Sequence, residues 1–162
     1  MSNFNKTRTA STSNIISLAE YKQSKTILME WKSLIKTEID NLEFHDDLPN
    51  TVNNDALTNA KLFTELLPLD INPPSLGLEP NGAILLEWYK KSLNGKTIIF
   101  STIIDEEKIT WAIFNSGQKS YGTLNFSDEF SKSLSVEVLS PLLQDYFGIK
   151  NDSQSKRSRY SV

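Results

Sequence analysis

The sequence predicts an α+β domain in which helices come first, a four-stranded antiparallel meander sheet follows, and a C-terminal helical segment closes the domain. Before residue 68, apolar residues recur at steps of three and four, which is typical of helices. From residue 83 onward they come in short runs between turns, which is typical of strands. Four of the six prolines lie between Pro68 and Gly82, and this stretch is predicted to be an extended, ordered connector.

The N-terminal part is predicted to form two helices. The first spans residues 14–43 with Ser13 as its N-cap, and a loop from His45 to Asn54 separates it from the second, which ends before Pro68. The second helix begins at residue 54 or 55 and runs to residue 67. The first helix has one face suited to burial, made of Ile27, Leu28, Trp31, Leu34, Ile35, Ile39 and Leu42.

The C-terminal segment from Ser127 to Phe147 is also apolar along one side. Pro141 interrupts it, and prolines favour the first position of a helix. The segment is therefore predicted to be a C-terminal helix, with the alternative of two short helices, the second capped by Ser140 and ended by Gly148.

Four strands are predicted, at residues 83–90, 97–104, 109–115 and 119–124. Asn94-Gly95 favours a two-residue hairpin turn, which would pair Tyr89 with Phe100 and carry Trp111 beside Thr102. One face of the sheet would then hold Leu85, Tyr89, Ile98, Phe100, Ile104, Ile109, Trp111 and Ile113. The opposite face would hold Ile84, Leu86, Trp88, Ile99, Ile103 and Phe114. Because both faces are apolar, a second layer is expected on each, and a face left without one would be a partner or dimer surface.

Length and composition fit one folded domain with a tail at each end. The 162 residues divide into a disordered tail at 1–13, a single domain at 14–150 and a disordered basic tail at 151–162. No apolar run approaches the length of a transmembrane helix, and the first residues lack the apolar segment of a secretory signal. Together with the absence of cysteine, this predicts a cytoplasmic protein without a membrane association.

The charge is distributed unevenly. Each tail carries +2, so the domain carries −7 of the total of −3, and all three arginines lie in the tails. A domain that is acidic and lacks arginine has few side chains that can bind phosphate, so nucleic-acid binding by the domain is not expected. The basic tails could make weak, salt-dependent contacts with phosphates, although solvated disorder is the simpler interpretation of them.

A few side chains are candidates for an interaction surface or a pocket. Glu87 lies between apolar residues of a strand, where a carboxylate can act as an acid or base or form a structural ion pair. Tyr89 and Trp111 would line the same pocket, although the packing role of a tryptophan is the simpler interpretation. Asp105, Glu106 and Glu107 form an acidic cluster at a hairpin tip, suited to a basic partner, a cation or plain solvation.

No catalytic, cofactor-binding or metal-binding residues are predicted. The single histidine, His45, stands beside two aspartates in a loop, but a metal site needs three or four convergent ligands. The sequence contains no glycine-rich phosphate loop and no nucleophile-elbow or zinc-protease motif.

The segment from Pro80-Asn81-Gly82 through Ile84 and Leu86 to Glu87-Trp88 resembles a strand entry found in a diffuse group of small, uncharacterised bacterial proteins. Some of these proteins look like members of toxin-antitoxin or defence gene cassettes. The resemblance covers about 15 residues and implies no catalytic residues.

The leading hypothesis is a non-enzymatic bacterial protein-binding module, such as an antitoxin, immunity protein or accessory subunit, that binds a protein partner or forms a homodimer. It rests on the lack of a catalytic constellation, the acidic domain and the surplus of apolar sheet surface. The alternatives are a small-ligand-binding protein or enzyme with a pocket between sheet and helices, or an acidic secretion chaperone.

Overall fold

The computed structural model describes residues 30–42 and 52–149. Within them, the predicted α+β fold is confirmed, with helices at both ends of an antiparallel sheet. The predictions for residues 14–29, for the loop that contains His45, and for the tails at 1–13 and 151–162 lie outside the described residues.

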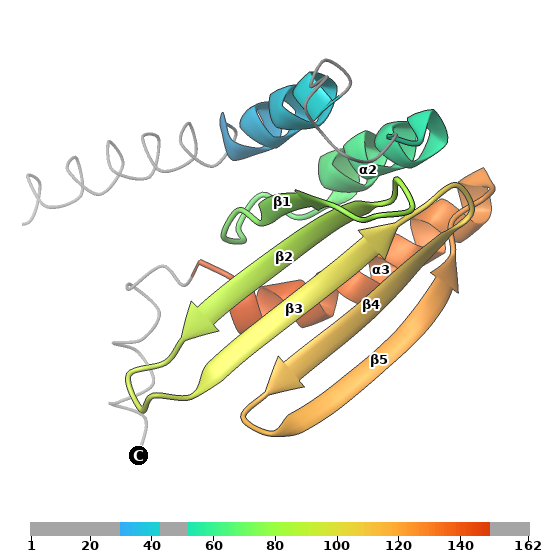
Figure 1. Cartoon of the computed structure of the whole chain (residues 1–162). Helices are drawn as coiled ribbons and strands as arrows, with labels where there is room; N and C mark the ends of the chain where they lie inside the picture. Colours follow the sequence, from blue (N-terminus) through green and yellow to red (C-terminus); the bar gives the residue numbers. More distant parts are fainter. Residues whose placement is uncertain (1–29, 43–51, 150–162) are drawn as a thin grey trace, which may run out of the picture.

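The sheet has five strands rather than four. Residues 30–42 are helical, and the elements that follow are α2 (Asn54–Leu66), β1 (Ser75–Leu78), β2 (Ile84–Lys91), β3 (Thr97–Ile104), β4 (Lys108–Asn115), β5 (Gln118–Asn125) and α3 (Glu129–Phe147). Every strand pairs antiparallel with the next, in the order β1-β2-β3-β4-β5. Figure 1 shows α3 crossing behind the sheet, with α2 and helix 30–42 stacked at one end, and no helix on the face toward the viewer.

The additional strand, β1, lies within the proline-rich connector. Leu76 pairs with Leu86 and Leu78 with Ile84, so two apolar side chains of the connector extend the buried face of β2. Gly77 lies between them, and a Cβ there would come within 3.2 Å of Leu85 Cδ2. A four-residue strand that contains glycine and follows two prolines has too weak a local signal to be predicted, and the pairing with β2 creates it.

One core lies between the sheet and the helices. Trp88 and Phe100 form an edge-to-face pair in the sheet layer, with ring centroids 5.8 Å apart. The buried positions of helix 30–42, Trp31, Ile35 and Ile39, confirm its predicted apolar face, whereas Leu34 is 63% exposed. In none of the helices described here do length and apolar character together suffice for a membrane span.

The predicted pairing of β2 with β3 is wrong by one residue. Trp88, not Tyr89, pairs with Phe100, because the turn has three residues rather than two. Ser92 N–H donates to Lys96 O at 2.8 Å, Gly95 N–H donates to Ser92 O at 3.0 Å, and Gly95 has a φ of 75°. This is the three-residue hairpin with a left-handed glycine. A shift of one residue exchanges the faces of a whole strand, so Leu85 and Tyr89 leave the predicted core face.

The predicted C-terminal helix is confirmed as α3, and the alternative of two short helices is wrong, because α3 is continuous with Pro141 inside it. Proline removes the hydrogen bond to the carbonyl of Glu137, one turn earlier. Both residues are exposed, so water can satisfy that carbonyl. Leu139 and Leu143 on either side of the proline are fully buried, and their packing holds the two halves of the helix in line.

The hydrogen bonds at the N-terminus of α3 predict how the stability of the fold depends on pH. The Asp128 carboxylate accepts a hydrogen bond from Ser131 N–H at 2.9 Å in a capping box, and this bond lowers the pKa of Asp128 below its ordinary value. The carboxylate therefore stabilises the fold above the ordinary aspartate pKa of about 3.9, and this stabilisation is lost as the pH falls through the lowered value. In acid unfolding followed by circular dichroism, we expect Asp128→Asn to unfold with a shallower dependence on pH between about 5 and 2. An unchanged pH profile would show that the cap carboxylate does not contribute.

Candidate functional site: the open face of the sheet

One face of the sheet is packed against the helices, and the other is not covered by any element that the structure describes (Figure 1). The strand registers place alternate residues on this second face, which we name the open face. It consists of Leu85, Glu87 and Tyr89 from β2, Ile99, Ser101 and Ile103 from β3, Thr110, Ala112 and Phe114 from β4, and Lys119, Tyr121 and Thr123 from β5.

The open face is unusually apolar for a surface in water. The aromatic side chains Tyr89, Phe114 and Tyr121 are 61%, 41% and 74% exposed. Between them, Ile99 and Ile103 are only half-buried, since no second layer covers them in the described part of the chain. A contiguous apolar patch with a polar rim on a small domain is typical of an interaction surface.

Glu87 is the acidic side chain within this apolar face. Ser101 Oγ, directly opposite on β3, donates to Glu87 Oε2 at 3.4 Å. Ser75 Oγ on β1 donates to the Glu87 main-chain oxygen at 3.2 Å. Among the described residues, no lysine forms an ion pair with Glu87. Its carboxylate is therefore half-buried, held by one long hydrogen bond, and able to accept a cationic or hydrogen-bonding group from a partner.

The predicted pocket lining of Glu87, Tyr89 and Trp111 is not brought together. Glu87 and Tyr89 lie on the open face, whereas Trp111 pairs with Thr102 and lies on the core face. The Trp111 indole stacks on Phe100, with centroids 6.3 Å apart and planes within 9°. It also covers Gly122 on β5, where a Cβ would come within 2.9 Å of the indole nitrogen. Trp111 is thus a packing residue that shields an edge-strand glycine.

Two carboxylates of the acidic cluster at residues 105–107 accept hydrogen bonds from nearby groups of the fold. The Asp105 carboxylate accepts hydrogen bonds from the N–H groups of Glu107 and Lys108, each at 2.9 Å, and so closes the β3–β4 turn. Glu106 Oε1 accepts from Asn53 Nδ2 at 2.8 Å, and Asn53 is the N-cap of α2. Within residues 30–42 and 52–149, no three acidic or histidine side chains are grouped to hold a metal ion.

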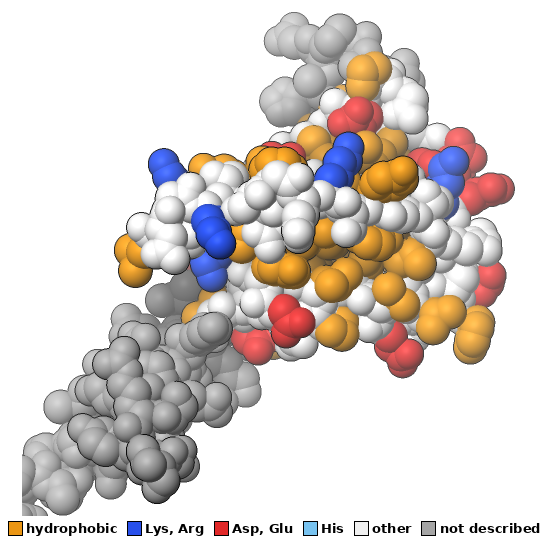
Figure 2. All heavy atoms as spheres, turned by 90° about the horizontal axis from the view of Figure 1, so that it is seen from below, with side chains coloured by type: hydrophobic (Ala, Val, Ile, Leu, Met, Phe, Trp, Pro, Cys, Tyr) orange, Lys and Arg blue, Asp and Glu red, His pale blue; other side chains and the backbone are white. Residues whose placement is uncertain are grey.

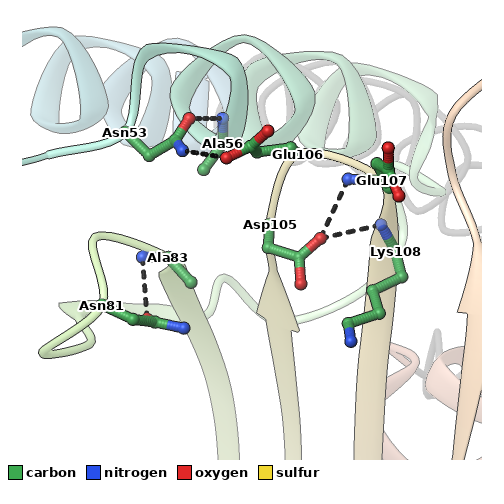
Figure 3. A pocket seen from close by; sticks show the side chains of 8 residues that line it. All are labelled: Asn53, Ala56, Asn81, Ala83, Asp105, Glu106, Glu107 and Lys108. Carbon is green, nitrogen blue, oxygen red and sulfur yellow. Dashed lines mark hydrogen bonds between the residues drawn. The ribbon is translucent and has the colours of Figure 1, made fainter.

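A shallow pocket of about 420 Å³ lies beside this turn, between α2 and the start of β2 (Figure 3). Its lining consists of Asn53, Ala56, Asn81, Ala83, Asp105, Glu106, Glu107 and Lys108. Several of its polar groups already bond within the molecule; for example, Asn81 Oδ1 accepts from Ala83 N–H at 3.1 Å. The pocket is therefore a polar recess in which several hydrogen-bonding groups are already used within the molecule.

The sequence interpretation missed Ile99, Phe114 and Tyr121 as members of the candidate surface. Ile99 and Phe114 were placed on the correct side of β3 and β4, but the error in the β2 register grouped them with the core residues Leu86 and Trp88. The signal that could have corrected it is Gly95, since a glycine at the third loop position favours a three-residue turn.

Comparisons of the chain with models of protein families, with curated proteins and with solved structures each gave no match.

Proposed function

We propose that this chain is a non-enzymatic protein-binding module that engages its partner through the open face, in the manner of an antitoxin, an immunity protein or an accessory subunit of a bacterial cassette. The observation that carries the proposal is the apolar, aromatic character of a five-stranded sheet face that no described element covers. A second layer supplied by another protein would remove these side chains from water.

The chemistry of the face indicates what kind of partner surface fits it. Tyr89, Phe114 and Tyr121 are large aromatic side chains of the sort that contribute most to binding at interfaces. Glu87 lies among them without an ion pair within the described residues, and a partner that buries it has to supply a hydrogen-bond donor or a cation. The complementary surface is therefore an apolar patch that places a hydrogen-bond donor or a cationic side chain opposite Glu87.

The proposal predicts the effect of a new charge on the open face. Phe114→Lys places an ammonium group within the apolar patch, where burial by a partner would cost several kcal/mol. We expect the tagged wild-type chain, purified from its native host, to elute with one protein at equal stoichiometry, and Phe114→Lys to lose it. Mass spectrometry of the eluate, with light scattering to measure the mass of the complex, gives the readout.

Leu93→Lys is the matched control. Leu93 is fully exposed at the tip of the β2–β3 hairpin and lies off the open face, so its variant has the same gain of charge and should keep the partner. Recovery of the wild-type chain without a stoichiometric partner would contradict the proposal. Equal loss of the partner in both variants would place the binding surface elsewhere.

A further inference from the structure

The two edges of the sheet differ in how they are protected. β1 has four residues and follows Pro73 and Pro74, and short strands with nearby prolines are poor templates for further pairing. β5 has eight residues in an unbroken ladder with β4, contains no proline, and carries a single charge, that of Lys119. An unprotected edge of this length pairs readily with another strand unless something covers it.

The hydrogen-bonding groups of β5 that point away from β4 can be identified. Phe126 N–H donates to Glu107 O, and since bonded pairs alternate along an antiparallel ladder, the even-numbered residues of β5 bond to β4. The N–H and C=O groups of Lys119, Tyr121 and Thr123 therefore point outward. None of them bonds to another group in the described part of the chain, whereas the next outward carbonyl, that of Asn125, accepts from Ser135 Oγ at 2.8 Å.

Apolar side chains accompany this edge on the side of the helices. Along α3, which begins beside the end of β5, Phe130, Leu134 and Val138 form an outward stripe and are 78%, 48% and 43% exposed. Figure 2 views the molecule from below Figure 1, the side on which β5 lies, and shows a broad hydrophobic patch bordered by lysine and acidic side chains.

We propose that β5 pairs with the β5 strand of a second copy of this chain, antiparallel and about a two-fold axis through Tyr121. In this register Tyr121 faces the second copy's Tyr121, and Lys119 faces the second copy's Thr123. These are the residues whose main-chain groups point outward, and three such pairs exchange about six hydrogen bonds. In this register every outward N–H and C=O group of Lys119, Tyr121 and Thr123 forms a hydrogen bond. The Asn125 carbonyl, which already accepts from Ser135 of α3, is not needed.

The charges at the two ends of β5 favour a second copy as the occupant. Lys119 lies at the β4–β5 turn, whereas Asp128 and Glu129 follow the other end of the strand at the start of α3. Lys119 faces Thr123 of the second copy, and antiparallel pairing places the second copy's Asp128 and Glu129 beyond it at the same end of the interface, where their charge is opposite to that of Lys119. No like charges face one another along the strands, because Lys119 is the strand's single charge.

The dimer would also enlarge the candidate binding surface. A two-fold axis normal to the sheet keeps the same face of each sheet on the same side. The open faces of the two copies then join into one continuous ten-stranded surface with the two Tyr121 side chains at its centre. The dimer itself does not depend on the proposed function, because it uses the main-chain edge of β5 rather than the side chains of the open face and is tested on the purified chain alone.

Thr123→Pro tests the pairing. Proline removes an outward N–H of β5 but none of the bonds between β5 and β4, and edge strands tolerate proline at such positions. We expect the full-length wild-type chain to show a monomer–dimer equilibrium in sedimentation velocity between about 1 and 100 μM, and Thr123→Pro to raise the dissociation constant at least about tenfold. Thr123→Ala, which keeps the N–H group, should stay within about threefold of the wild type.

Hydrogen exchange and a charge variant complete the test. In the wild type, exchange of the Tyr121 and Thr123 amides should slow as the protein concentration rises, because the dimer occupies them. If Thr123→Pro fails to fold, Lys119→Glu replaces it, and the loss of opposite charges should weaken the dimer and reduce its salt dependence. A wild-type chain that stays monomeric throughout the concentration range would overturn the proposal, as would a dimer that both variants leave unchanged.

Discussion

Replacing Trp88 with alanine is expected to lower the free energy of unfolding by about 4 kcal/mol, a large part of the total for a domain of this size. Trp88 is 1% exposed at the centre of the sheet layer and forms an edge-to-face pair with Phe100. Its indole N–H donates to Asn72 O at 2.9 Å, which ties β2 to the connector that precedes β1. The variant loses the packing of the indole ring, leaves a cavity in the core and leaves the Asn72 carbonyl without its hydrogen-bond donor. Urea unfolding followed by circular dichroism measures the change.

Tyr89→Ala is the control for this experiment, because Tyr89 is the next residue along β2 and points to the open face. It is 61% exposed, so its removal should change stability by no more than about 0.5 kcal/mol. The pair of variants also distinguishes the two registers of β2 and β3. If Tyr89→Ala were the more destabilising of the two, the one-residue shift in the structure would be refuted.

Asn59→Asp is expected to destabilise the fold by about 3 kcal/mol at neutral pH, because it removes two hydrogen bonds and buries a charge. Asn59 is 5% exposed on α2, and its Nδ2 donates to the carbonyls of Asp105 and Glu106 at 3.0 and 2.9 Å. These bonds join α2 to the β3–β4 turn. A carboxylate in this place would face two carbonyl oxygens and could donate to neither while ionised.

The sign of the pH dependence follows from the same geometry. Burial beside two acceptors raises the pKa of the new carboxyl above that of an unfolded aspartate, so the destabilisation is largest above the raised value and shrinks as the pH falls toward about 4. Urea unfolding of Asn59→Asp at several pH values measures it. Asn54→Asp, the same change at an exposed position of α2, should be nearly neutral. Equal destabilisation in the two variants would contradict the assigned role of Asn59.

The regular elements were largely predictable from the sequence. The helix α2 begins at Asn54 and ends at Leu66, close to the predicted residues 54–67, because Asn53 caps it and Pro68 ends it. β3 has the predicted bounds of residues 97 and 104. These elements carry strong local signals, namely a cap, a breaking proline and a strand rich in β-branched residues.

The candidate site was less predictable than the elements that carry it. Glu87 and Tyr89 were identified as candidates, and the structure places them on one surface, but Trp111 lies on the opposite side of the sheet. The error has a single origin in the length of the β2–β3 turn. Because side chains alternate along a strand, one extra turn residue reassigns every candidate on β2 to the other face.

The sequence was enough to predict the order and type of the elements other than β1, the lack of a recognisable catalytic motif and the surplus of apolar side chains in the strands. Which of those side chains are covered depends on the packing of the helices and on the strand registers. β1 exists because Leu76 and Leu78 pair with β2, and α3 continues through Pro141 because Leu139 and Leu143 are held in the core. Both outcomes depend on contacts between residues far apart in the chain, and local propensities of about 1 kcal/mol or less are too small to decide them.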